Sequence, residues 1–253
     1  MLTLLGAVLG LVFGSFIGAL VIRWPQDRSV SAGRSVCDHC GAQLRARDLV
    51  PLASYALRRG RAACCGAGIE PVHALAEAGG LIVGLLSALV ANSPAEALCA
   101  AVMGWLLLAL ALLDLRNFWL PDRLVAALAV AALLPLAMGL PPSVGDRLIG
   151  GLSAWLAFMA IRVLYRRLRS REGMGAGDAK LFGALGLWLG WRLLPVLLLL
   201  AALGGLAVAL ALAIGRGGVD RSSRLPFGLF LALAAWPLEV LLLAGWLASE
   251  GAR

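Results

Sequence analysis

The sequence predicts an all-α membrane protein with about eight transmembrane helices and a small cytoplasmic subdomain that a zinc ion would staple. Of its 253 residues, 61% are hydrophobic and only 14% are charged, and the mean hydropathy is +0.91. So few charges do not cover the surface of a water-soluble domain, so the composition argues against a soluble enzyme. The apolar runs each approach the roughly 20 residues that cross a bilayer as a helix.

The hydropathy pattern gives the expected spans in chain order. Residues 2–22 lack the basic start and the small-residue cleavage site of a signal peptide, so we expect a retained helix there. The sixth span is the shortest. The expected spans are residues 2–22, 74–92, 95–113, 121–140, 147–165, 179–191, 193–214 and 226–248.

The basic residues indicate the orientation of these helices. If the N-terminus lies outside, every Lys and Arg except Arg147, Arg192 and Arg253 falls in a cytoplasmic loop. Membrane proteins collect positive charge on the cytoplasmic side. The formal charge of +8 therefore reports topology, and we expect contacts with membrane lipid but no nucleic-acid partner.

We expect three parts along the chain: a first transmembrane helix over 1–22, a cytoplasmic Cys-containing subdomain over 23–73, and a transmembrane domain over 74–253. The middle part is rich in Gly, Arg, Cys and Pro and has little helical periodicity. A hydrophobic core of that size is marginal, so a bound metal would help this part to fold.

Four of the five cysteines lie in the polar subdomain, where a reducing cytoplasm disfavours disulfides. Residues 37–41, Cys-Asp-His-Cys-Gly, have the form of a zinc knuckle. The second group, Cys64 and Cys65, is adjacent in sequence, and adjacent residues converge on one tetrahedral ion less easily than residues separated by two. One interpretation is a site of Cys37, Cys40 and Cys65 completed by Cys64 or a histidine, and the other is a set of free thiols.

Acidic residues at the span edges need an explanation, because an ionised carboxylate at membrane depth costs about 2.5 kcal/mol or more. These residues are Glu77, Asp114, Asp122 and Asp178. Asp122 and Asp178 could favour helix starts through the helix dipole, and Asp114 could pair with Arg116.

For Asp178 the helix-start explanation is weaker. The segment 173–178 holds three glycines in five residues, and a helix start needs only one capping residue. Gly175 and Gly177 remove side chains beside Asp178, which would let a substrate backbone approach. Two carboxylates that converge near water suit aspartic-protease chemistry, in which one activates a water and the other, protonated, polarises the scissile carbonyl.

Other functions also use intramembrane acids. A transporter could relay protons or ions through Asp114 and Asp178. Against this, the acids cluster at one membrane face and the two halves show no inverted repeat. A zinc-dependent membrane scaffold without catalysis is a third interpretation.

Motifs along nearly the whole chain resemble those of one family. They are Gly14-Ser15-Phe16, Arg23-Trp24-Pro25, the knuckle 37–40, Asp48-Leu49-Val50-Pro51-Leu52-Ala53-Ser54-Tyr55, Glu77, Asp114 with Leu120-Pro121-Asp122, the segment 175–181 and Pro226-Phe227-Gly228. With these motifs the chain resembles the type IV prepilin peptidases, bacterial intramembrane aspartic proteases of the GxGD class.

The resemblance implies that Asp114 and Asp178 are the catalytic pair and that residues 74–253 are the peptidase domain. Members of the family cut prepilins or pseudopilins after a Gly that follows a short basic leader. The resemblance thus implies a multi-pass protein of the bacterial inner membrane, its active site facing the cytoplasm and its proteolytic step needing no cofactor.

The resemblance also bears on methylation and on the metal. Many members methylate the new N-terminus with S-adenosylmethionine, and zinc would be held by Cys37, Cys40, Cys64 and Cys65. Two positions depart from the family pattern: Ala62 stands where a second Cys-x-x-Cys would begin, and Gly18 replaces an Asn. A peptidase without methyltransferase activity is therefore the alternative, and the sequence identifies no residues for the methyl donor.

Overall fold

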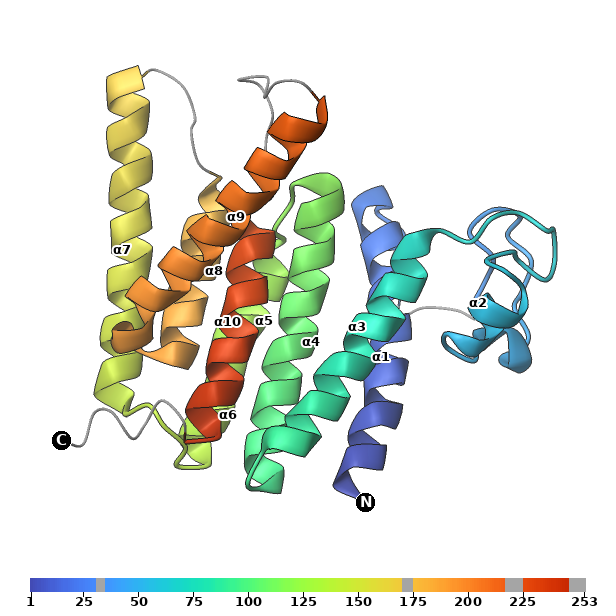
Figure 1. Ribbon diagram of the computed structural model, residues 1–253, viewed down its shortest axis with the longest axis horizontal. Helices are drawn as coiled ribbons and strands as arrows, with labels where there is room; N and C mark the ends of the chain where they lie inside the picture. The colour runs from blue at the N-terminus through green and yellow to red at the C-terminus, as the bar shows by residue number, and fades with distance from the viewer. Residues whose placement is uncertain (31–34, 170–174, 217–224, 246–253) are drawn as a thin grey trace. The chain divides into compact units, whose positions relative to one another are not determined.

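A computed structural model describes residues 1–30, 35–169, 175–216 and 225–245 (Figure 1). Within these residues every regular element is helical, apart from two isolated β-bridges, so the all-α prediction is confirmed. The chain forms two compact units, Met1–Leu89 and Val90–Arg253, which we describe separately. The three-part division expected from the sequence stays a prediction.

The first unit is built on α1 (Leu2–Arg23) and α3 (Pro71–Val90). Their contact is made by small residues: a Cβ on Gly10 would overlap the carbonyl oxygen of Gly80, and a Cβ on Gly6 would overlap that of Gly84. Glycines recur at every fourth residue of α1 from Gly6 to Gly18, which places them on one helix face. Such stripes let helix backbones touch in lipid, where apolar side chains alone give no preference for another helix.

The polar segment between these helices holds two short 3₁₀ helices, η1 (Trp24–Gln26) and η2 (Ala46–Leu49), and α2 (Ala53–Leu57). Asp38 ties the segment to both long helices, because its carboxylate accepts hydrogen bonds from Arg23 Nε at 3.1 Å and His73 Nε2 at 3.3 Å. The polar segment is thus held to α1 and α3 by the contacts of Asp38 as well as by its covalent connections.

The second unit contains α4 (Pro94–Asn117), α5 (Asp122–Ala131), α6 (Leu133–Ala137), α7 (Val144–Arg169), α8 (Ala176–Leu189), η3 (Trp191–Leu193), α9 (Leu194–Arg216) and α10 (Phe227–Leu243) (Figure 1). Two helices are central. Helix α8 packs against α5, α7 and α10, and α10 also packs against α4 and α9. This arrangement brings the end of α4 and the starts of α8 and α10 together.

Two buried polar side chains of the second unit, those of Trp188 and Arg147, donate to backbone carbonyls. Trp188 Nε1 donates to Leu128 O at 2.8 Å, which joins α8 to α5. The guanidinium of Arg147 is 3% exposed and donates to the carbonyl oxygens of Leu140, Pro141, Pro142, Leu187 and Trp188. Arg147 thereby closes the C-terminal end of α8, where the helix carbonyls have no intrahelical partners.

Five helices among the described residues, α1, α3, α4, α7 and α9, are long and apolar enough to cross a membrane, and α10 is shorter. The chain is therefore a multi-pass membrane protein, whereas the count of eight spans stays a prediction. The expected span 121–140 is two helices, which break between Ala131 and Leu133. The cause is Pro135, whose ring clashes with the carbonyl four residues earlier, at Ala131.

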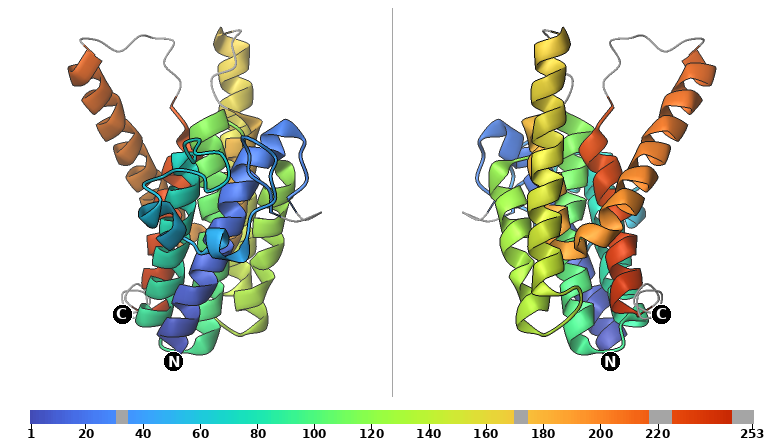
Figure 2. Two further views of the ribbon diagram at one scale, coloured as in Figure 1. Left: turned by 90° about the vertical axis from the view of Figure 1, so that its right-hand side faces the viewer. Right: turned by 90° about the vertical axis from the view of Figure 1, so that its left-hand side faces the viewer.

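Helices α7 and α9 leave most of their apolar surface uncovered. Figure 2 shows α9 leaning away from α10 toward its own C-terminal end. Exposed side chains such as Leu199, Leu203 and Leu210 therefore suit contact with lipid chains rather than water.

The glycine contact in the first unit predicts a large effect from one methyl group. Gly80→Ala would push a Cβ into the Gly10 carbonyl and force α1 and α3 apart, so we expect the thermal unfolding midpoint in detergent to fall by several degrees. Gly145→Ala is the matched control, because a Cβ there meets only Ser143 Oγ at 3.9 Å. Equal midpoints for the two variants would contradict this packing.

Candidate active site and metal centre

The first acidic position, Asp114, lies in the last turn of α4 and is 5% exposed. Helix α4 ends three residues later, because Phe118 turns into the left-handed region at φ 51° and returns its N–H to Asp114 O. The carboxylate Oδ2 accepts a hydrogen bond from the backbone N–H of Leu229, in the first turn of α10, at 2.9 Å. This bond from a free helix-start N–H stabilises negative charge on Asp114.

The second position, Asp178, lies in the first turn of α8, which begins after Gly175 as N-cap. Its side chain is half-buried, and its Oδ2 is 3.3 Å from where a Cβ of Gly175 would be. Gly175 itself is exposed. The preceding Gly173 and Met174 of the glycine-rich segment lie outside the described residues.

Leu120, in the short connection between α4 and α5, links these positions. A Cβ on Gly177 would lie 2.9 Å from Leu120 Cβ, and a Cβ on Gly228 would lie 2.9 Å from both Leu120 Cδ1 and Asp114 Oδ2. The side chain of Leu120 thus fills a socket made by the starts of α8 and α10. Gly177 serves this packing, whereas the sequence suggested that it leaves room for substrate.

The pKa of Asp178 agrees with a position close to Asp114. Burial, together with the negative charge on Asp114, raises the pKa of Asp178 from 3.8 to about 6. Asp178 precedes the expected span 179–191 and lies outside the five long apolar helices. Two close carboxylates cannot both ionise at ordinary cost, so the pair retains a proton where an isolated aspartate has lost it.

The other acidic positions have separate partners. Asp122, in the first turn of α5, accepts from Lys180 Nζ with both carboxylate oxygens at 2.7 Å, so the single lysine of the chain pairs with a carboxylate. Glu77 accepts the N–H of Leu52 at 2.8 Å and fixes that residue at φ 57°. Glu239 of α10 is fully buried, and neither carboxylate oxygen has a partner among the described residues.

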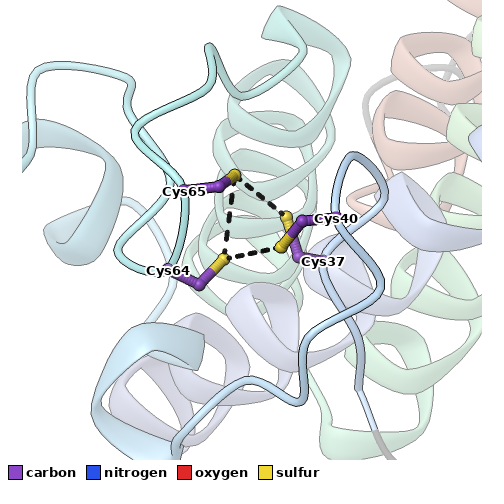
Figure 3. Close-up of side chains that lie close together, drawn as sticks. All are labelled: Cys37, Cys40, Cys64 and Cys65. Atoms are coloured by element: carbon purple, nitrogen blue, oxygen red, sulfur yellow. Dashed lines mark hydrogen bonds between the residues drawn. The ribbon is translucent and has the colours of Figure 1, made fainter.

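The four cysteines of the polar segment come together. Figure 3 shows their sulfur atoms facing one another from two loops. All four Sγ atoms lie within 4.8 Å of one another, with Cys37–Cys65 at 3.9 Å, Cys40–Cys64 at 3.4 Å and Cys64–Cys65 at 3.9 Å. This cluster could hold a metal ion.

The two cysteine loops repeat one backbone pattern, which explains how adjacent cysteines converge. In the first loop Gly41 N donates to Cys37 O, and in the second Gly66 N donates to Ala62 O, each at 2.9 Å. Ala62 therefore occupies the place of Cys37. Cys65 is then the structural equivalent of Cys40. The sulfur that Ala62 lacks is supplied by Cys64, the residue before Cys65.

The histidine alternative for the fourth ligand is disfavoured, because among the described residues the four cysteines alone make up the group of mutually close ligand atoms. His73 Nε2 is engaged with Asp38 rather than turned to the sulfurs. The backbone N–H groups of Cys40 and His39 lower the pKa of Cys37 to about 7, whereas the contact with Cys40 raises the pKa of Cys64 to about 12. A thiolate, the form that binds metals, is therefore favoured first at the buried Cys37.

Comparison with known proteins identifies the group to which this architecture belongs. The family model of the bacterial peptidase A24 N-terminal domain matches residues 8–92, and that of the type IV leader peptidase family matches residues 101–210. A prepilin leader peptidase/N-methyltransferase of Aeromonas hydrophila is 38% identical over 206 residues, covering 80% of this chain and 70% of that protein. The chain belongs to the type IV leader peptidase family.

Further relatives cover more of the chain. A protein of the same name from Burkholderia pseudomallei is 38% identical and spans 89% of this chain and 81% of its own length. One from Stutzerimonas stutzeri is 34% identical and spans 90% of this chain and 87% of its own length. No solved structure matches. The two family models of this leader peptidase family member divide the chain near the boundary between its two compact units.

Sequence reasoning missed the contacts of Leu120 and Leu229 beside the acidic residues, and the contact of His73 with Asp38. Leu229 acts through its backbone N–H, 115 residues from Asp114, so its residue type carries no signal. Leu120 falls within the quoted Leu-Pro-Asp motif. The signal that could have found its packing role is the pair of glycines that face it, Gly177 and Gly228. His73 lies just before the expected second span, and the sequence there does not indicate that its partner is Asp38.

The cysteine cluster predicts a bound metal in this leader peptidase family member. Elemental analysis of the purified chain should give about one ion per chain, and Cys64→Ser should lower this value strongly because three thiolates remain. Cys99→Ser is the control, since Cys99 lies in α4, outside the cluster, with its sulfur against Met138. Full metal content in the Cys64→Ser protein would remove Cys64 from the ligand set.

Proposed function

We propose that this chain is an intramembrane aspartic endopeptidase that removes the short basic leader of type IV prepilins or pseudopilins after a Gly. The single observation that carries the proposal is the convergence of Asp114 and Asp178 around Leu120, at the ends of otherwise apolar helices. The names of the relatives supply the substrate class.

In the proposed reaction the two carboxylates share one proton. The N–H of Leu229 favours the ionised form of Asp114, and the raised pKa of Asp178 favours its protonated form. Asp114 takes a proton from a water molecule, whose oxygen attacks the carbonyl carbon of the leader Gly, while Asp178 donates to the oxygen of that carbonyl. Proton transfer to the amide nitrogen then breaks the C–N bond and releases the leader acid and a new amine.

We propose that the site faces the cytoplasm from the bacterial inner membrane. The distribution of basic residues supports this orientation, because Arg116, Arg123 and Lys180 flank the two acidic blocks. A basic leader is itself retained on the cytoplasmic side by the same rule. Enzyme and substrate would therefore present their cleavage chemistry at one membrane face.

We propose zinc as the ion of the cysteine cluster, held by Cys37, Cys40, Cys64 and Cys65. Four thiolates are a typical structural zinc set, and Zn–S bonds of about 2.3 Å place tetrahedral sulfurs about 3.8 Å apart. The separations of 3.4 to 3.9 Å between neighbouring sulfurs suit that geometry. The ion would join the two loops of a segment too small to build a large core, and the peptidase step needs no cofactor.

We also propose that the chain methylates the new N-terminus with S-adenosylmethionine, on the support of the relatives' names alone. We assign no residue to this methyl donor. Mass spectrometry of the cleaved product should show the added mass of one methyl group when the donor is present and none when it is omitted. Cleaved product without the methyl group in both reactions would leave a peptidase alone.

The peptidase proposal predicts that both carboxylates are indispensable. Asp114→Asn and Asp178→Asn should each lower the cleavage rate of a prepilin peptide in detergent by about a hundredfold or more, because neither amide transfers protons. Asp146→Asn is the matched control, since Asp146 begins α7 beside Gly190, at the other end of α8. Unchanged cleavage in either test variant would remove that residue from the proposed pair.

A further inference from the structure

The polar segment of the first unit carries an exposed face that is made only of apolar side chains. The exposed residues of α2 are Ala53, Ala56 and Leu57, and their spacing of three and four places them on one face of that helix. Leu57 is 85% exposed. Just before α2, Leu49 and Val50 are 40% and 49% exposed, so exposed apolar side chains also precede the helix. A face of this kind on an otherwise polar segment indicates an interaction surface.

Arginines flank this apolar face in the sequence. Residues 45–61 hold five arginines and one acidic residue, Asp48, which is paired with Arg58. Arg59 and Arg61 are exposed, and neither forms an ion pair within the part of the chain that the structure describes. The positive charges of Arg59 and Arg61 therefore suit an anionic ligand.

Glu77 fixes the depth of this surface along α3. Its carboxylate accepts the backbone N–H of Leu52, the residue before α2, at 2.8 Å. Glu77 is the seventh residue of α3, about 9 Å along the helix axis from Pro71. Because α3 is long and apolar enough to span a membrane, its first turns pass through the headgroup region. Residues 49–57 are thus held at the level of interfacial helices, which lie about 5–10 Å into the boundary between headgroups and acyl chains.

We infer that these apolar and basic side chains form a membrane-interface anchor that binds anionic phospholipid. The side chains of Leu49, Val50 and Leu57 enter the acyl-chain boundary. Arg59 and Arg61 bind the lipid phosphates, because a long arginine side chain reaches the headgroups while its stem stays in apolar surroundings. The anchor goes beyond the proposed peptidase function and does not depend on it.

Position and charge favour lipid over a soluble protein as the occupant. The polar segment is joined at its two ends to α1 and α3, both long and apolar enough to span a membrane, so it stays within reach of the bilayer. The hydrogen bond to Glu77 holds residues 49–57 beside α3 rather than away from the membrane. In the proposed cytoplasmic orientation, the surface meets the leaflet whose anionic lipids attract basic residues next to membrane spans, by about fivefold in affinity per residue.

Photo-cross-linking of the full chain in vesicles tests the anchor. A benzophenone amino acid replaces Leu57 in one variant and, in the matched control, the exposed Gln43, which pairs with Val36 across the first cysteine loop. This probe leaves the native cysteines unchanged. The vesicles consist of phosphatidylcholine with a minority of the anionic lipid phosphatidylglycerol. We expect the yield of lipid adduct at position 57 to exceed that at position 43 by about tenfold.

The identity of the cross-linked lipid tests the arginines. Phosphatidylglycerol should make up a larger share of the adducts at position 57 than of the bilayer, by about fivefold. Arg59→Gln together with Arg61→Gln should return this share to the bilayer composition, because glutamine carries no charge. Arg192→Gln, in η3 of the second unit, is the control and should leave the share unchanged. The share is a ratio within one sample, so partial loss of folded protein does not alter it.

Three results would overturn the anchor. Equal lipid adducts at positions 57 and 43 would place the surface in water. Adducts of position 57 with a second copy of the chain, or with residues 90–253 of the same chain, in place of lipid would identify a protein contact. A phosphatidylglycerol share equal to the bilayer composition in the chain with both arginines would contradict the binding of anionic lipid. None of these measurements uses cleavage, so failure of the anchor and failure of the proposed peptidase function are distinguishable.

Discussion

The carboxylate pair depends on close contact between helices at positions without side chains. Leu120 fits between Gly177 and Gly228, and the same Gly228 leaves room for the Oδ2 of Asp114. In lipid the apolar surface of a helix gains nothing from burial against another helix, so the distance at which backbones meet decides the arrangement. If α10 stood one methyl group further away, Asp114 would lose its N–H donor, which is Leu229 of α10.

Close contacts between helices at glycines recur away from the two carboxylates. Glycines bring α1 and α3 together in the first unit, and Gly150 meets Gly186 between α7 and α8 in the second. Charges inside this frame are held by backbone groups: Arg147 by carbonyls and Asp114 by an N–H. The contact from α10 holds Asp114 in place, which suits the proposed reaction because that reaction needs two carboxylates at a fixed separation.

Periodicity and hydropathy predicted the helices well, because a bilayer demands long apolar runs. They missed the break before Leu133, since Pro135 acts on a carbonyl four residues earlier without changing hydropathy. The motifs singled out Asp114 and Asp178, and the catalytic role of these two carboxylates stays a prediction. The N–H of Leu229 could not be predicted, because a backbone donor leaves no mark in the sequence. The convergence of Cys64 with Cys65 follows from the repeated loop that ends at Gly41 and Gly66, a spacing visible only once the two loops are compared.

The most direct test of this account is oxidative cross-linking of Asp114→Cys with Asp178→Cys, in a chain whose native cysteines are replaced. The account predicts rapid disulfide formation in the membrane, because the end of α4 and the start of α8 meet around Leu120. The control pair Asp114→Cys with Asp146→Cys should stay reduced, since Asp146 lies at the other end of α8. Absence of the first cross-link, or equal yields for the two pairs, would contradict the convergence on which the proposed function rests.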